Sequence, residues 1–210
     1  MYDHFVSALR RVEAYLNESC MRKLIYFIAC TADGFIARED GSFDFFPMTG
    51  EHLPYIVREY PETIPGHLRQ EFGAQGVSRH FDAVVMGRRT YEVGSAMGLT
   101  NPYPHLRQFV VSSTMTASPD AAVEHVRDDP VSLVRRLKAE PGLGVWLCGG
   151  ATLAGALYHE IDKLIVKVNP VVLGCGIPMF QGASGAIRLD LVEHQAFGGG
   201  VAIQSYRVMR

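Results

Sequence analysis

The chain has 210 residues, of which 48% are hydrophobic and 20% are charged, and its formal net charge is −2. A chain of this length and composition fits one globular domain with a full hydrophobic core. Because its charge is balanced, no basic face is expected, so nucleic acid and anionic membranes are not expected partners.

The N-terminal region is predicted to be a helical extension over residues 1–20, followed by the main domain over 21–210. Apolar residues recur at helical spacing over 2–16, which predicts a short amphipathic helix. The continuously apolar segment 23–30 predicts a strand buried on both faces, as in the centre of a parallel sheet. A glycine- and proline-containing loop follows over 31–50, and long loops in compact domains are usually functional.

The rest of the chain alternates between helical and extended patterns. Helices are predicted over 51–60, 67–75, 88–97, 132–140 and 151–158, and strands over 83–86, 108–112, 144–148 and 163–168. Asp129 is expected to cap the fourth of these helices, with Pro130 in its first turn. The last two strands, 187–197 and 201–208, are joined by three glycines as a hairpin. This order predicts an α/β fold with a mostly parallel, mixed sheet and an antiparallel C-terminal hairpin.

Cysteine usage and the N-terminal composition indicate a reducing compartment. The four cysteines show neither close pairing nor metal-site spacing, so we expect free thiols and no metal site. The first twenty residues contain no apolar core of a signal peptide. We therefore expect a cytoplasmic protein.

Three tight junctions after predicted strands carry groups that suit phosphates. They are Gly87-Arg88-Arg89-Thr90, Ser112-Ser113 and Gly149-Gly150-Ala151-Thr152. In open α/β sheets ligands bind at the carboxyl ends of the strands, and helix N-termini attract anions, so the junctions should converge on one ligand. Neighbouring helix positions point about 100° apart, so Arg88 or Arg89 is expected to face solvent.

A set of segments, taken in order, resembles the dihydrofolate reductase superfamily. They are 32–37 (ADGFIA), 86–92 (MGRRTYE), 111–113 (VSS), 149–153 (GGATL) and 169–180 (NPVVLGCGIPMF). The chain is more closely similar to the reductase domain of bacterial bifunctional riboflavin-biosynthesis deaminase-reductases and their stand-alone relatives. The resemblance covers residue 21 to the C-terminus and implies the dihydrofolate-reductase-like three-layer fold. It also implies an NADPH-dependent reductase of a small pyrimidine- or pterin-like substrate. The zinc-binding signature of the deaminase half of those bifunctional enzymes is absent from this sequence.

The junctions and the resemblance together give the candidate site residues. The NADPH site would comprise Ala29, Ile36, Gly87, Arg88, Arg89, Thr90, Ser112, Ser113, Gly149, Gly150, Ala151, Thr152 and Leu153. The substrate site would comprise Phe35, Pro170, Gly174, Gly176 and Phe180. The resemblance implies that Ser112 and Ser113 lie near the adenosine 2′-phosphate, which favours NADPH over NADH. It also implies a cis peptide between the paired glycines.

The proton donor is the least defined part of the predicted site. Asp33 and Asp44 lie in the loop that should border the nicotinamide. Either carboxyl group would donate the proton that the substrate needs when it accepts the hydride. Each also has an ordinary interpretation, because Asp33 precedes Gly34 in a turn and Asp44 suits a solvated loop.

Two other functions and an assembly prediction stay open. Dihydrofolate reduction itself is one, although the tryptophan-proline-acid pattern of those enzymes is echoed only by Phe46-Pro47 and Glu51. A non-catalytic NADP-binding module, such as a redox sensor, is the other. The long segment 47–81 indicates a substrate pocket peculiar to this chain. A homodimer is expected, because the terminal hairpin offers a sheet edge and the N-terminal helix needs a surface to cover.

Overall fold

The computed structural model describes residues 22–210. The predicted helix over 2–16 and the extension over 1–20 lie outside this range. Within it, no helix is both long and apolar enough to cross a membrane. The same residues contain no cluster of three or more histidine, cysteine or acidic side chains arranged to hold a metal.

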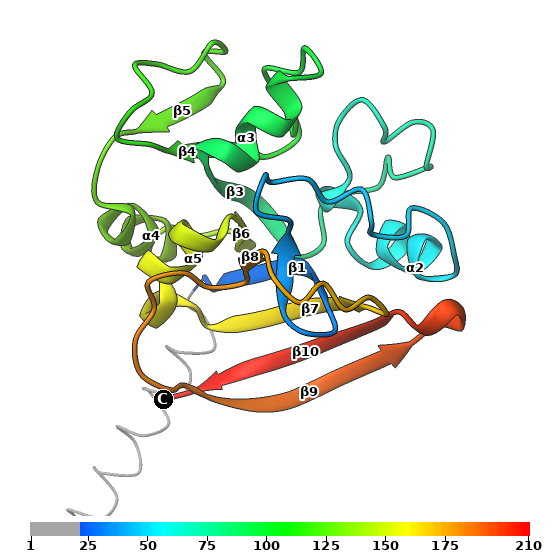
Figure 1. The fold of residues 1–210 in the computed structure, drawn as a ribbon. Coiled ribbons are helices and arrows are strands. Elements are labelled where there is room, and N and C mark those ends of the chain that lie inside the picture. The colour runs from blue at the N-terminus through cyan, green and yellow to red at the C-terminus, as the bar shows by residue number, and fades with distance from the viewer. Residues whose placement is uncertain (1–21) are drawn as a thin grey trace, which may run out of the picture.

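An eight-stranded sheet forms the centre of the molecule, in the order β5-β4-β3-β6-β1-β7-β10-β9 (Figure 1). The strands are β1 (Leu24–Thr31), β3 (Phe81–Gly87), β4 (Arg107–Val111), β5 (Val123–Val126), β6 (Gly144–Gly149), β7 (Lys163–Asn169), β9 (Arg188–Ala196) and β10 (Ala202–Met209). Neighbouring strands from β5 to β7 run parallel, whereas β10 is antiparallel to both β7 and β9. The mostly parallel, mixed sheet with its C-terminal antiparallel hairpin is therefore confirmed.

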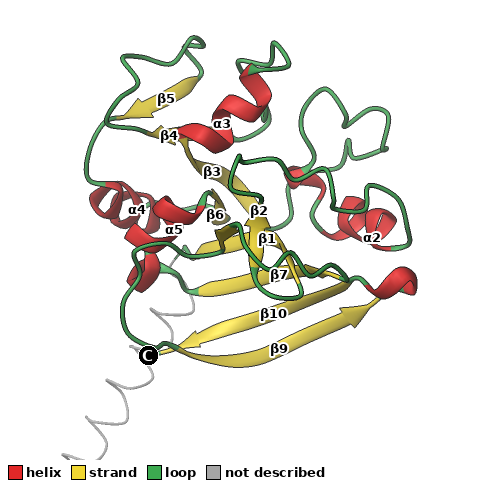
Figure 2. Ribbon diagram, viewed as in Figure 1, coloured by secondary structure: helices red, strands yellow, loops and turns green. Residues whose placement is uncertain are grey.

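Helices cover both faces of the sheet and give three layers (Figure 2). The helices are α2 (His52–Glu59), α3 (Arg88–Ser95), α4 (Pro130–Ala139) and α5 (Ala151–Ala156). Tyr26 of β1 packs in the core cluster that includes residues of α4 and α5. Its neighbour Phe27 packs in the opposite cluster, with residues of α2 and α3. Successive side chains of a strand point to opposite faces, so a strand covered on both sides is continuously apolar, as predicted for 23–30.

Local signals placed most elements within a few residues of their observed bounds. The cap of α4 is confirmed, because the Asp129 carboxylate accepts a hydrogen bond from the Ser132 amide at 2.9 Å. Three short strands were not predicted: β5 at the sheet edge, and β2 (Phe35–Ala37) with β8 (Ile177–Pro178), which form a separate two-stranded sheet.

The helix predicted over 67–75 is wrong. This segment runs through successive turns between Pro65 and Gly73, and Gly73 has a positive φ of 66° that ends any helical run. The Arg69 guanidinium donates to the backbone carbonyls of Pro61 and Gly76, at 2.6 and 3.1 Å. Arg69 therefore binds backbone carbonyls on either side of the segment, and a helical pattern does not report these contacts.

Candidate active site

A cleft runs along the carboxyl ends of β1, β3, β4 and β6. Its volume is about 1410 Å³, above the roughly 300–1,000 Å³ of pockets that hold drug-sized ligands, so it has room for a dinucleotide beside a substrate. It is lined by every predicted cofactor residue except Gly149, namely Ala29, Ile36, Gly87, Arg88, Arg89, Thr90, Ser112, Ser113, Gly150, Ala151, Thr152 and Leu153. The three junctions therefore meet in one place, as their positions after parallel strands require.

Two of the junctions lie directly against each other. A Cβ placed on Gly87 would lie 3.5 Å from the Gly150 amide nitrogen and 3.6 Å from the Gly149 carbonyl oxygen. Gly149 has a φ of 110°, which is open to glycine and rare for other residues. The peptide between Gly149 and Gly150 is cis, as the resemblance implied. The end of β3 and the end of β6 thus form one backbone-lined cradle.

Arg88 connects the first junction to the turn after β4. Its Nε donates to the Glu92 carboxylate at 2.6 Å, and its Nη1 donates to the Thr114 hydroxyl at 2.9 Å. Ser112 is buried, and its hydroxyl accepts from the amides of Thr114 and Met115, at 3.3 and 3.0 Å. The Ser112 hydroxyl therefore shapes this turn, while Ser113 is exposed in the cleft and free to contact a ligand.

Another part of the lining is mainly aromatic and apolar, although Glu39 and Asp40, in the same loop as Phe43, also line the cleft. Phe43, Phe46, Tyr103 and Cys148 line it beside Ala29. The Tyr103 ring stands edge-on to Trp146, with 5.1 Å between ring centroids. Burial raises the pKa of Tyr103 well above its usual value and raises the pKa of Cys148 to about 12. Both groups therefore keep their protons at neutral pH, and the Tyr103 hydroxyl is a hydrogen-bond donor in this part of the lining.

The structure does not bring Asp33 or Asp44 into the lining of the cleft. Asp33 accepts hydrogen bonds from the amides of Leu173 and Gly174, at 3.1 and 2.8 Å, so it holds the segment after β7 against the turn after β1. The Thr31 hydroxyl, followed by the Gly174 amide, lowers the pKa of Asp33 to about 2. Asp44 pairs with Arg38 and its side chain is 79% exposed. A proton-donor role has no geometric support at either position.

Replacing Asp33 with asparagine is expected to lower the melting temperature at pH 7. The folded-state pKa lies below the ordinary value of 3.8, so the ionised carboxylate stabilises the fold above that pH. This stabilisation is lost as the pH falls through about 2, so the difference between the proteins should shrink over that window. Melting curves from pH 7 to pH 2 measure it, with Asp44→Asn as the matched control. A difference that stays constant down to pH 2 would contradict the assignment.

The predicted substrate residues are only partly at the cleft. Gly176 lines it, and Ile177 and Pro178 continue the same wall. The other four do not line it, and each has a different position. Phe180 packs against Tyr26 and Tyr158, with ring centroids 5.3 and 5.2 Å apart. Gly174 binds Asp33, Phe35 pairs with Pro178 across the small sheet, and Pro170 lies against Gly200.

Sequence reasoning missed the residues that shape the apolar part of the lining. Phe43 and Phe46 lie in the loop after β2, and Tyr103 lies in the loop before β4. No motif marks them, since each reaches the cleft through a loop whose path depends on packing. The one available signal was the group of phenylalanines at 43–46 in a loop that was expected to be functional.

Comparison with known proteins places the chain among reductase-like folds. The family model of the RibD C-terminal domain matches residues 22–203. The uncharacterized proteins YwjB and YyaP of Bacillus subtilis (strain 168) are 31% and 25% identical to it. Those alignments cover 89% of this chain and 98% of YwjB, and 88% of this chain and 94% of YyaP.

Solved structures give the same fold. A protein of Shewanella sp. PV-4 assigned to riboflavin biosynthesis has a TM-score of 0.67 at 22% identity, covering 90% of this chain and 99% of that one. The Thermotoga maritima diaminohydroxyphosphoribosylaminopyrimidine deaminase/5-amino-6-(5-phosphoribosylamino)uracil reductase has 0.64 at 15%, covering 93% and 58%. Enterococcus faecalis dihydrofolate reductase, complexed with NADP(H), has 0.60 at 15%, covering 90% and 97%. These likenesses confirm the dihydrofolate-reductase-like fold.

Proposed function

We propose that this chain, which belongs to the RibD C-terminal domain family, is an NADPH-dependent reductase of a small planar heterocycle, pyrimidine- or pterin-like. The observation that carries the proposal is the convergence of three phosphate-type junctions and Arg88 on one cleft beside an apolar compartment. Reductases of the dihydrofolate-reductase-like fold need such a pair of neighbouring sites, one for the dinucleotide and one for the ring that is reduced. Bound NADPH would supply the hydride.

The residues present fit this cofactor. A Cβ on Gly150 would lie 3.5 Å from the Thr90 hydroxyl, so the glycine leaves open a cradle that a side chain would fill. Backbone amides and the Thr90 hydroxyl there would hold the pyrophosphate. Arg88 and Ser113 would hold the adenosine 2′-phosphate, because a guanidinium matches phosphate oxygens with two parallel donors. Ala29 and Ile36 would flank the nicotinamide.

The apolar part of the cleft would exclude water from the reacting ring. Phe46 is buried, and its ring lies 5.9 Å from the Lys167 ammonium, which stands behind it and does not line the cleft. The Tyr103 hydroxyl remains as a donor that keeps its proton at working pH. We propose that it donates a hydrogen bond to a polar atom of the ring and so orients it for hydride transfer.

The test uses the single tryptophan of the chain. Trp146 is separated from the cleft by the Tyr103 ring, so bound NADPH should quench its emission. We expect NADPH to bind at least about tenfold more tightly than NADH, since the 2′-phosphate adds charge-assisted hydrogen bonds. Free N-acetyltryptophanamide corrects for absorption by the cofactor. If neither cofactor binds, the proposed function is wrong.

Turnover separates the remaining alternatives. With NADPH saturating, absorbance at the reduced nicotinamide band would be followed with pyrimidines, pterins, quinones, imines and dihydrofolate. If NADPH is oxidised only in the presence of dihydrofolate, the chain is a dihydrofolate reductase. If NADPH is oxidised in the presence of another ring compound, the reductase proposed above is supported. Tight NADPH binding without oxidation by any acceptor would support a non-catalytic module.

We also propose that the chain forms a homodimer through β9. This strand of nine residues is one of the two edges of the sheet, and Leu189, Leu191 and Val192 are exposed on it. An edge strand that exposes a group of apolar side chains is a surface that proteins usually cover. Light scattering at micromolar concentration should give the mass of two chains, and Leu191→Glu should give the mass of one. A single-chain mass for the wild type would contradict the dimer.

A further inference from the structure

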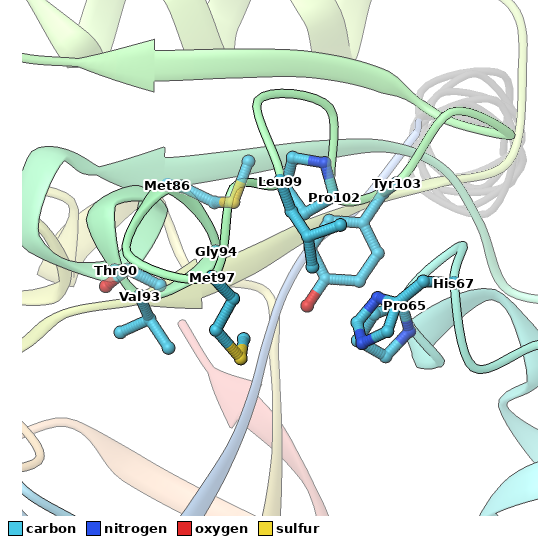
Figure 3. Close-up of a pocket in the computed structure, with 10 residues that line it drawn as sticks. All are labelled: Pro65, His67, Met86, Thr90, Val93, Gly94, Met97, Leu99, Pro102 and Tyr103. Carbon is cyan, nitrogen blue, oxygen red and sulfur yellow. The ribbon is translucent and has the colours of Figure 1, made fainter.

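A second, smaller cavity opens beside the cleft against α3 (Figure 3). Its volume is about 80 Å³. Thr90, Val93 and Tyr103 line both this cavity and the cleft, so it is a side compartment of the same site, called the annex below. Figure 3 shows the Tyr103 hydroxyl pointing into the space between Met97 and Pro65.

The walls of the annex are almost entirely hydrocarbon. Beyond the three shared residues, they include Met86 at the end of β3, and Met97 and Leu99 in the turn after α3. Dry apolar cavities bind apolar groups, and one of about 150 Å³ accepts benzene. At about 80 Å³ the annex is too small for a ring and fits a group of one to three carbons.

Exposed apolar side chains surround the opening. Val93 is 39% exposed, Met97 is 62% exposed, and Phe43 in the lining of the cleft is 44% exposed. An apolar ligand would cover this surface. The arginines that line the cleft are Arg88 and Arg89, which follow β3, and Arg127, which follows β5, and none of the three lines the annex. The described lining residues of the annex include no lysine or arginine, and His67 is the one among them that can carry a positive charge.

From these observations we infer that the annex binds a short alkyl substituent of the substrate. The substrate class is an uncharged planar heterocycle that carries an alkyl group of one to three carbons, in place of a sugar phosphate. Tyr103 lines both the cleft and the annex, so it stands where the ring would meet its alkyl group. This inference rests on the proposed function, because it takes the cleft to be the site of the reduced ring.

The experiment measures binding, so it does not depend on turnover. The full chain, with and without saturating NADP⁺, is titrated in a calorimeter with 2-amino-4-hydroxypyrimidine, its 6-methyl and 6-propyl derivatives, and uridine 5′-monophosphate. We expect affinity to rise about fourfold for each CH₂ group that enters the annex. Uridine 5′-monophosphate should bind no more tightly than the unsubstituted ring.

Two variants change the annex in opposite directions. Leu99→Phe fills it and should abolish the gain from the propyl group, whereas Met97→Ala widens it and should preserve or increase that gain. Neither residue lines the cleft, so NADPH binding should be unchanged in both. Met97 is exposed, so its variant remains a fair test if Leu99→Phe fails to fold.

Methionine methyl groups give a second readout in the NMR spectrum of protein labelled with ¹³C at those methyls. The 6-propyl compound should shift the signals of Met86 and Met97 and leave that of Met48, which is outside both cavities, unchanged. Equal affinities across the alkyl series, or alkyl binding without shifts at Met86 and Met97, would overturn the inference. Absence of NADPH binding to the same samples would instead contradict the proposed function, because the alkyl series is also read without cofactor.

Discussion

Replacing Arg88 with alanine is expected to weaken NADPH binding by about ten- to a hundredfold and to leave NADH binding nearly unchanged. Arg88 is held between Glu92 of α3 and Thr114 of the turn that also carries Ser113. This position faces the space where the adenosine 2′-phosphate would lie. Hydrogen bonds between charged partners are stronger than those between neutral ones, and removing the guanidinium would remove two of them from the NADPH complex. NADH lacks the 2′-phosphate, so its affinity should change little when Arg88 is replaced.

The measurement is the Trp146 titration with both cofactors, on the wild type and on two variants. Arg136→Ala is the matched control, because Arg136 is also exposed, pairs with Glu124 at 3.3 Å and does not line the cleft. Equal losses of affinity for NADPH and NADH would show that Arg88 contacts a part of the dinucleotide that both cofactors share, and not the 2′-phosphate. No loss for either would place the dinucleotide elsewhere. The same titration of Arg89→Ala distinguishes the two neighbouring arginines of the first junction.

The fold was largely predictable because its signals are local. The apolar segment that became β1 is buried on both faces, and the Asp129-Pro130 start of α4 is set by a side chain three residues from its partner. The hairpin of β9 and β10 is marked by its glycine run. The prediction for 67–75 failed because the apolar spacing is helical, whereas Arg69 binds the carbonyls of Pro61 and Gly76 on either side of the segment and the positive φ of Gly73 ends the run.

The candidate site was likewise predictable only where its residues carry a local signal in the sequence. Glycines and hydroxyls at strand ends were found because parallel strands bring their carboxyl ends to one edge whatever the details of packing. The apolar compartment was not found, because Phe43, Phe46 and Tyr103 reach it from loops whose paths are set by distant contacts. Asp33 shows the opposite error. Its turn position was recognised, but its partners Leu173 and Gly174 lie some 140 residues away in the sequence and gave no sign of its structural role.

Replacing Gly155 with alanine is expected to destabilise the fold by about 3 kcal/mol. A Cβ at this position would lie 1.8 Å from the Gln181 carbonyl oxygen and 2.8 Å from its carbonyl carbon, and backbone cannot rotate away as a side chain can. Alanine would gain about 1 kcal/mol in helix propensity, which is too little to offset this overlap. The loss of stability should therefore dominate, although Gly155 lies inside α5 where alanine is usually favoured.

Thermal or urea unfolding measures the change, with Gly76→Ala as the control. Gly76 has no atom within 4 Å of a Cβ, so its substitution should change stability by no more than about 1 kcal/mol. The close contact at Gly155 has a functional consequence as well. Gln181 lines the cleft, and its backbone N–H donates to the Ala151 carbonyl at 3.1 Å. The helix α5 and the segment after β8 therefore form one wall of the cleft. Folded Gly155→Ala protein should thus bind NADPH more weakly. Unchanged stability would show that this wall stands apart from α5 in solution, and the cleft would then be open on that side.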